Sequence, residues 1–196
     1  MDFDFIKTNL EKKGYKVSCF ETKEDAAAYL NGEIDGVTVG IGGSMTVKEL
    51  GLLDMLRAHN DVRWHWEGND RMEALATDVY LSSVNGISER GEIVNIDGVG
   101  NRLAGTLYGH KKLYFIVGKN KIADDLDGAI WRARNVAAPK NAIRFNVKTP
   151  CVASGGAKCF DCRSPERICK ALLVLWDRPD GIPDTEVVLI DEELGY

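Results

Sequence analysis

KKLYFIVG, residues 111–118, is followed by IADDLDGAIWRARNVAA, residues 122–138, and these two stretches decide the fold. After its two lysines, the first stretch is almost wholly apolar, which is typical of a strand in a sheet covered on both faces. The second has the periodicity of an amphipathic helix, and we expect Pro139 to end it. A buried strand followed by such a helix is the repeating unit of a parallel α/β sheet.

The same alternation extends towards both ends of the chain. Apolar runs predict strands over residues 16–20, 36–43, 62–66, 78–84, 171–177 and 185–191. Amphipathic runs predict helices over residues 3–13, 22–32, 44–60, 71–77 and 100–109. Residues 86–98 predict a hairpin. We therefore expect an α/β fold, a single domain over residues 1–196 with an open, Rossmann-like and mainly parallel sheet.

The composition is that of a folded, acidic domain. The chain has 196 residues, 44% of them hydrophobic, with a formal net charge of −5 and a pI near 5.3. An acidic chain lacks the clustered basic surface of a nucleic-acid-binding protein. No apolar run approaches the roughly 20 residues that a membrane-spanning helix needs. The first residues are acidic where a secretory signal is basic, so we expect a cytoplasmic protein with no nucleic-acid partner and no membrane span.

Four of the five cysteines lie within nineteen residues of one another, in a segment that breaks the alternation. The segment reads TPCVASGGAKCFDCRSPERICK, with the spacing Cys151-x7-Cys159-x2-Cys162-x6-Cys169. Cytoplasmic thiols stay reduced, so such a cluster is more often a metal or catalytic site than a set of disulfides. A long irregular loop in a compact domain is usually functional or held together by something else. We therefore expect residues 146–170 to form a metal-binding or cluster-binding loop.

Three interpretations of these cysteines remain open. A 4Fe–4S iron–sulfur cluster takes four cysteines with loose, asymmetric spacing, as here. Structural zinc more often uses two Cys-x-x-Cys pairs, and this segment has one, at Cys159 and Cys162. The third interpretation is four reduced thiols, or a redox disulfide within that pair. Lys158, Arg163 and Arg167 would offset the negative charge of thiolates.

A glycine-rich turn suggests a second site. In VGIGGSMTVKELG, residues 39–51, a strand runs through Gly42 and Gly43 into a helix that Ser44 and Thr46 open. Free backbone N–H groups at the carboxyl edge of a sheet favour an anion. The ending of a nucleotide-binding P-loop is absent. The alternative is a tight strand-to-helix turn with an N-cap, and Thr46 has capping-box spacing to Glu49.

Asn101 and Arg102 are the other candidate ligands of an anion. They lie in VNIDGVGNRLAG, residues 94–105, where Gly98 and Gly100 would let the backbone approach a ligand closely. The loop should lie near the strand ends where open sheets bind ligands. Alternatively, Asn101 only caps a helix.

Other polar residues receive simpler interpretations. Cys19, alone in its strand, is expected to be a small buried side chain. His110 is expected at the surface. Arg132, Arg134 and Arg144 are expected at a solvated helix end, where cations complement the helix dipole, with contact to an anionic ligand or partner as the alternative.

Several blocks of this sequence, in the same order, resemble the lactate-utilisation (LUD) domain family, in particular its short, single-domain bacterial members. The blocks are GIGGSMTVKELG (40–51), NGISERGEIVNIDGVGNRLAGTLYG (85–109), VGKNKIADDLDGAIWRARNVAAPKNAIR (117–144) and the cysteine segment, within roughly residues 35–170. The resemblance implies the fold of ribose-5-phosphate isomerase, glucosamine-6-phosphate deaminase and the CoA transferases. A similar loop of the isomerases holds a phosphate, which implies anion binding by Gly42, Gly43, Ser44 and Thr46. The isomerase's acidic catalytic loop has no counterpart here.

The resemblance also implies a part in oxidising lactate to pyruvate, within an iron–sulfur, electron-passing complex. This chain has cysteines for one cluster and lacks the ferredoxin-like cysteine runs of larger subunits. We therefore expect a redox component of organic-acid metabolism, one subunit of a lactate-oxidising complex with redox partner subunits. The alternative is an enzyme or accessory subunit, a homo-oligomer included, that binds a small anionic metabolite and carries a purely structural zinc.

Overall fold

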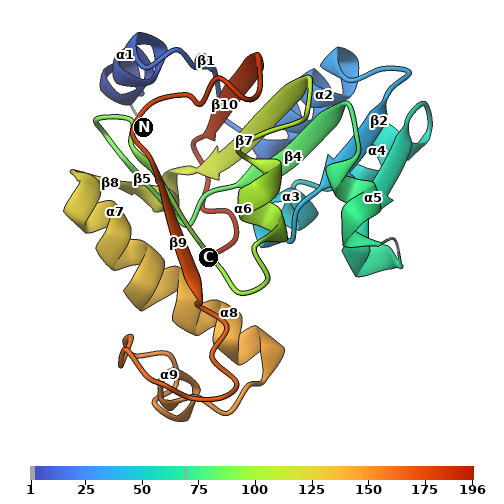
Figure 1. Cartoon of the computed structure of the whole chain (residues 1–196). Coiled ribbons are helices and arrows are strands. Elements are labelled where there is room, and N and C mark those ends of the chain that lie inside the picture. Colours follow the sequence, from blue (N-terminus) through green and yellow to red (C-terminus); the bar gives the residue numbers. More distant parts are fainter. Residues whose placement is uncertain (1–2, 69) are drawn as a thin grey trace.

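The computed structural model describes residues 3–68 and 70–196, which form a six-stranded sheet, a four-stranded sheet and the helices around them (Figure 1). All strand pairs in the six-stranded sheet are parallel. In spatial order its strands are β1 (Lys16–Phe20), β10 (Asp184–Ile190), β7 (Lys112–Gly118), β4 (Val79–Ser83), β2 (Thr38–Ile41) and β3 (Asp61–Trp64). The expected α/β fold with an open, mainly parallel sheet is confirmed.

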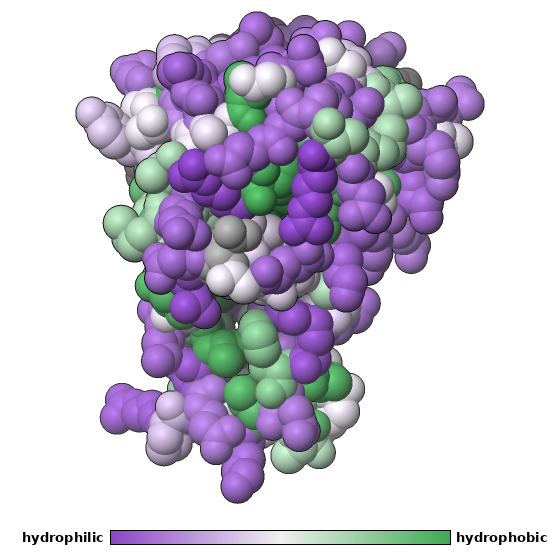
Figure 2. Space-filling view, turned by 90° about the vertical axis from the view of Figure 1, so that its right-hand side faces the viewer, coloured by the Kyte–Doolittle hydropathy of each residue, from purple (hydrophilic) through white to green (hydrophobic). Residues whose placement is uncertain are grey.

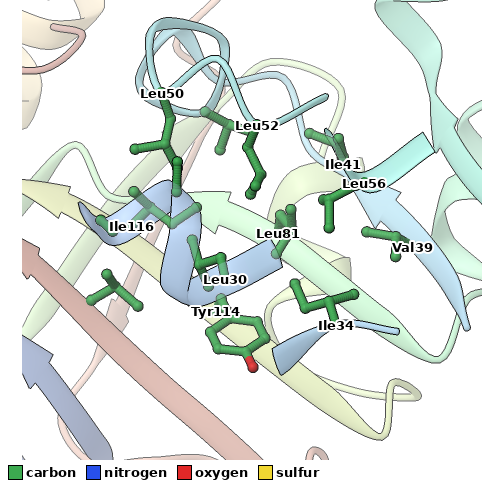
Figure 3. Close-up of a cluster of buried hydrophobic side chains, with 14 of the residues drawn as sticks. Leu30, Ile34, Val39, Ile41, Leu50, Leu52, Leu56, Leu81, Tyr114 and Ile116 are labelled. Carbon is green, nitrogen blue, oxygen red and sulfur yellow. The ribbon is translucent and has the colours of Figure 1, made fainter. Parts of the chain in front are cut away.

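Strand β7 lies inside this sheet, and its side chains alternate between two hydrophobic cores. Leu113, Phe115 and Val117 face one core, whereas Tyr114 and Ile116 face the other, and all five are fully buried. Figure 3 shows the second of these cores, where side chains of helix α2 (Lys23–Glu33) pack against the sheet. Burying one large apolar side chain stabilises a fold by about 1.5–3 kcal/mol, so a strand covered on both faces anchors the domain.

The four-stranded sheet was not expected. It contains β8 (Ile122–Ala123), β5 (Gly86–Ser88), β6 (Ile93–Asp97) and β9 (Ala171–Leu175), in that spatial order. The antiparallel pair β5–β6 confirms the hairpin. Strand β9, expected in the main sheet, instead pairs antiparallel with β6. Because β9 follows the cysteine segment directly, this pairing attaches that segment to the body of the protein.

The helices are short. They are α1 (Asp4–Lys12), α2, α3 (Met45–Glu49), α4 (Leu53–Arg57), α5 (Arg71–Leu75), α6 (Asn101–Gly105), α7 (Leu126–Arg132), α8 (Ala138–Phe145) and α9 (Pro150–Ala153). Single 3₁₀ turns lie at η1 (His65–Glu67) and η2 (Lys119–Lys121). In the described part of the chain, none of the helices has the length and apolar character needed to cross a membrane.

The helix expected over residues 44–60 is divided into α3 and α4. The division falls at Gly51, whose φ of +70° lies in the left-handed region that ends helices. The hydroxyl of Ser44 caps α3 by accepting the N–H of Val47. The expectation that Thr46 forms a capping box with Glu49 is therefore wrong.

The long helix after β7 does not end at Pro139. Helix α7 continues through a π-helical turn, η3 (Ala133–Ala137), into α8, and Pro139 is buried in the first turn of α8. Proline is tolerated in a first turn because its missing N–H is not needed there, and the wider π turn separates it from α7. The rod of α7 and α8 thus runs from the small sheet to the cysteine segment (Figure 1).

Three simpler expectations are also wrong. Cys19 is exposed, because β1 is an edge strand. His110 is buried, with its ring stacked on Tyr80 at 4.6 Å between centroids and its Nδ1 donating to the carbonyl of Thr77. Arg132 is buried rather than solvated, because its guanidinium has carbonyl oxygens to bind.

Candidate functional site

The cysteine segment forms a separate lobe at one end of the molecule, with the end of α8. We call residues 146–170 the cysteine lobe; it is the lowest part of Figure 1. The lobe begins where Asn146 ends α8 in a left-handed conformation (φ 54°). It returns to the body at Gly98, where a side chain is impossible because a Cβ would lie 2.5 Å from the carbonyl oxygen of Ile168. Gly98 thus serves close packing of the lobe.

The four clustered cysteines line one small cavity inside this lobe. The cavity, of about 20 Å³, is bounded by Cys151, Cys159, Cys162 and Cys169. Its other walls are mostly apolar and include Ala138, Pro139, Ala142, Phe160 and Ile168. All four thiols are free of disulfides and only partly buried. The fold therefore brings together the four residues that the sequence singled out, around a space of inorganic rather than organic-ligand size.

Hydrogen-bond donors and cations surround the sulfurs. The backbone N–H of Asp161 donates to Sγ of Cys159 over 3.3 Å, and the hydroxyl of Thr149 lies 3.1 Å from Sγ of Cys151. Arg134 places Nη2 4.0 Å from Sγ of Cys159. Arg167 donates to the carbonyls of Cys162 and Cys169, and the neighbouring Cys169 raises the pKa of its guanidinium. Such groups stabilise thiolates.

Of the three cations expected around the thiolates, Arg167 alone is seen to bind the cysteine backbone. Lys158 lies over the ring of Phe160 instead. Within residues 3–68 and 70–196, no group of three or more His, Cys, Asp or Glu side chains is arranged to hold a single metal ion.

A larger cleft, of about 400 Å³, lies between the carboxyl edge of the sheet, α8 and the cysteine lobe. In Figure 2 the molecule narrows towards the lobe, and hydrophobic side chains show there within a mostly hydrophilic surface. Asp97 is the cleft's one acidic residue among those described, and it lies 4.0 Å from Nε of Arg102. The basic side chains that line the cleft are Arg71, Arg102, Arg144, Arg167 and Lys170. We call this space the basic cleft.

Arg144 is held rigidly on one wall of the basic cleft. Its guanidinium lies over the ring of Trp66 at 4.7 Å and over the ring of Phe145 at 4.1 Å. Its Nε and Nη2 both donate to Oδ1 of Asn141, one turn earlier in α8. Partial burial lowers the pKa of Arg144. A guanidinium that lies against two rings loses little further freedom when it binds an anion.

The structure places the expected anion ligands in different surroundings. Gly43 and Asn101 line the basic cleft. Arg102 also lines it, but its guanidinium donates to Oδ1 of Asn95 and of Asn85 and to the carbonyl of Ile96. Burial lowers the pKa of Arg102. The guanidinium of Arg102 therefore already donates its hydrogen bonds to the protein itself.

Gly42 and Gly43 allow the loop to pass close to other groups of the cleft. A Cβ at Gly42 would lie 3.1 Å from Cγ of Arg102, and a Cβ at Gly43 would lie 3.3 Å from the ring of Trp66. The N-cap of α6 is Gly100, so Asn101 is not the capping residue. Asn101 is one of the residues that line the cleft.

Ser44 and Thr46 are buried away from the basic cleft. The hydroxyl of Thr46 donates to the carbonyl of Leu194 and accepts a hydrogen bond from Nζ of Lys121. Lys121 is 3% exposed, and it also donates to Ser83 Oγ and the carbonyl of Val84. Burial lowers its pKa well below the usual value, and Arg132 and Arg102 lower it further. Residues near the end of the chain cover this hydroxyl–lysine cluster.

Comparison with known proteins agrees with this architecture. The family model described as LUD domain matches residues 4–190, nearly the whole chain. The chain belongs to the LUD domain family. LUD proteins are associated with lactate utilisation. A solved relative in fold is the crystal structure of a DUF162 family protein from Deinococcus radiodurans, with a TM-score of 0.54 and 15% sequence identity over 97% of this chain and 99% of that one. No curated protein matches the chain.

In this LUD chain, the cysteine cavity and the basic cleft share a wall. Ala138, Arg167, Ile168 and Cys169 line both spaces. A further surface cleft of about 390 Å³ meets the same wall on another side, at Arg167, Cys169 and Cys159. A centre held by the cysteines would therefore be separated by one layer of residues from a ligand in the basic cleft.

Several residues of this LUD cleft could not be predicted from the sequence. Trp66, Arg71 and Lys170 were not singled out, and Arg144 was expected to be solvated. The signal that could have found Arg144 is its position one turn after Asn141 on the cleft-facing side of a helix that leads into the cysteine lobe. Trp66 and Arg71 carry no such signal, because the turn between β3 and α5 alone brings them there.

Proposed function

We propose that this LUD protein is a redox component of organic-acid metabolism whose four cysteines hold an iron–sulfur cluster. The observation that carries the proposal is the single cavity that Cys151, Cys159, Cys162 and Cys169 line together. Soft thiolates are the ligands that such clusters take. Backbone N–H donors to sulfur and nearby arginines are the groups that stabilise a negatively charged cluster and set its potential.

The residues present fit a 4Fe–4S cluster in number and kind. One Cys-x-x-Cys pair with two separate cysteines matches the loose spacing of cubane sites better than the paired knuckles of structural zinc. A cubane needs more room than the present cavity, so the four thiols would draw apart around it. Their partial exposure and their place on a surface lobe make that adjustment inexpensive. When bound, the cluster would supply one-electron transfer.

The chain's own residues would shape the electron path. Arg167 holds the backbone of Cys162 and Cys169 by hydrogen bonds and faces the basic cleft at the same time. The basic cleft would bind an organic anion. The half-buried cysteines lie near enough to the surface for a cluster to exchange electrons with redox partner subunits in the cytoplasm. The protein would then act as one subunit of a lactate-oxidising complex.

The experiment is purification without oxygen, followed by an absorption spectrum and iron and sulfide analysis. We expect a brown protein with an absorbance maximum at about 400 nm, the signature of a cluster with cysteine ligands. Cys162→Ser should lose the colour and the iron. Cys19→Ser is the matched control, because Cys19 is a free thiol on β1 outside the cavity, and it should keep both. A colourless wild-type protein with stoichiometric zinc would contradict the cluster.

A second candidate function is favoured by the basic cleft. In this case the protein binds or transforms a small anionic metabolite there, alone or as an accessory subunit, and a zinc ion in the cysteine cavity only ties the lobe together. The observation that favours it is the excess of cations over acids around the cleft. Zinc in the purified protein, together with anion binding that survives Cys162→Ser, would support this candidate over the first.

A further inference from the structure

The basic cleft carries more positive charge than its own acids neutralise. Asp97 lies beside Arg102, which leaves Arg71, Arg144 and Lys170. In the described part of the chain, none of these three side chains has a carboxylate within ion-pair distance. Arg167 has one, Asp161, at 3.5 Å, but that carboxylate is largely exposed and is shared with Arg134. Solvent screening makes such a shared, exposed pair weak.

Arg144 is the cation best prepared to take a ligand. The rings of Trp66 and Phe145 and the amide of Asn141 fix its guanidinium. Both N–H groups of its Nη1 have no acceptor among residues 3–68 and 70–196. An arginine fork with free N–H groups binds two oxygens of one phosphate or carboxylate side by side.

The volume of the cleft argues against a very small ligand. Its 400 Å³ falls in the range of about 300–1,000 Å³ that is typical of sites for larger organic ligands. A three-carbon monocarboxylate would fill a fraction of this space and would pair with one of the cations. Three or four cations without partners are matched instead by two or more negative charges at separate points of one ligand.

We infer that the basic cleft binds a small organic molecule with at least two negative charges, with Arg144 as the anchor of one anionic group. A phosphate ester and a di- or tricarboxylate share this chemistry. Arg71, Lys170 and Arg167 meet the remaining charge. The inference rests on the proposed binding of an organic anion in the cleft, and it does not depend on which metal the cysteines hold.

Isothermal titration calorimetry of the anaerobically purified full chain tests this inference. The probes are inorganic pyrophosphate, glucose 6-phosphate, citrate and lactate. We expect at least one multiply charged probe to bind about tenfold or more tightly than lactate. The better of glucose 6-phosphate and citrate then distinguishes a phosphate ester from a polycarboxylate. Lactate binding as tightly as every other probe, or no binding by any probe, would overturn the inference.

Variants show whether Arg144 is the anchor. Arg144→Gln should weaken the best probe by about ten- to a hundredfold, the loss expected for a charge-assisted bidentate contact. Arg90→Gln makes the same change of charge at an exposed hairpin turn outside the cleft, and its affinity should stay within about twofold. Equal losses in the two variants would overturn the assignment.

Two further measurements keep the outcomes separate. Arg144→Lys retains the charge but lacks the fork, so it should lose binding while keeping the melting temperature of the wild type, even if Arg144→Gln folds poorly. The absorbance at about 400 nm is recorded on the same samples. A colourless protein that binds the multiply charged probe supports the cleft inference and contradicts the cluster, whereas a brown protein without that binding does the reverse.

Discussion

Two groups of cations in this molecule lie in different surroundings. The committed cations, Arg102, Lys121 and Arg132, lie at the carboxyl ends of the strands and donate to oxygens of the protein itself. The cleft cations, Arg71, Arg144 and Lys170, lie along the basic cleft, and in the described part of the chain none of them has a carboxylate within ion-pair distance. The first group is therefore part of the fold, and the second is available to a ligand.

Asn85 shows how tightly the committed cations are joined. Its side-chain oxygen accepts from Arg102, and its carbonyl accepts from Arg132 over 2.6 Å. Arg132 also donates to the carbonyl of Asn120, and burial lowers its pKa to about 10. Hydrogen bonds of this kind compensate for removing a charge from water. Basic residue type alone therefore says little about ligand binding; what decides it is whether the donors already have acceptors.

The largest effect that tests this comparison is expected at Arg102. Arg102→Met keeps an apolar stem beside Gly42 but removes one donor each from the side-chain oxygens of Asn85 and Asn95, and it removes the positive charge beside Asp97. We expect the free energy of unfolding to fall by about 3–5 kcal/mol, the usual cost of removing one partner of a buried charge network. Urea denaturation at neutral pH measures it.

Arg71→Met is the matched variant among the cleft cations. Because Arg71 is exposed and has no ion-pair partner among the described residues, its free energy of unfolding should change by no more than about 0.5 kcal/mol. If the two variants were equally stable, the division between committed and cleft cations would be wrong.

Lys121 provides a smaller effect that depends on pH. Burial lowers its pKa in the folded chain, so between that value and the usual value near 10.5 the unfolded chain binds more protons than the folded one. The stability of the wild type should therefore rise with pH in this window, relative to Lys121→Met, by at most about 1.4 kcal/mol per pH unit. Urea denaturation of both proteins across mildly alkaline pH measures the difference.

The comparison of Lys121→Met with the wild type removes the contribution of other groups that titrate in alkali. The lost hydrogen bonds to Thr46 and Ser83 lower the stability of the variant by an amount that does not change with pH. Parallel curves for the two proteins would show that Lys121 keeps its ordinary charge in the folded state, contrary to its placement among buried hydroxyls.

The main sheet could be predicted from the sequence because its signals are local. The apolar run of β7 and the hydroxyl of Thr22, which caps α2 by accepting the N–H of Asp25, act within a few residues. The convergence of the cysteines could also be predicted, since four thiols in one short loop cannot lie far apart. The hairpin β5–β6 was predicted for the same reason.

Other features could not be predicted because they depend on distant contacts. The partner of β9 is β6, far earlier in the chain, so the sequence of β9 alone does not show which sheet this strand joins. The passage of a helix through Pro139 depends on a π turn, which has no reliable sequence signal. Arg102, Arg132 and Arg144 look alike in the sequence, and only the acceptors around each of them separate the committed cations from the cleft cations.

The smallest expected effect concerns His110, a buried base in which one ring nitrogen lacks a hydrogen-bond partner in the described part of the chain. Its Nδ1 donates to the carbonyl of Thr77, whereas Nε2 is buried without a partner in the described part of the chain. Burial lowers the pKa of His110, so below about pH 6.5 the unfolded chain binds more protons and the wild type loses stability as the pH falls.

His110→Gln should have a lower stability at neutral pH but lack this part of the slope, whereas Tyr108→Phe, at an exposed neighbour, should keep it. Thermal unfolding of the three proteins between about pH 5 and 7 measures the slopes. Equal slopes in wild type and His110→Gln would mean that a buried base can be charged here without an acceptor at each nitrogen. The distinction between committed cations and cleft cations would then be wrong, because it rests on the acceptors around residues such as Arg102 and Lys121.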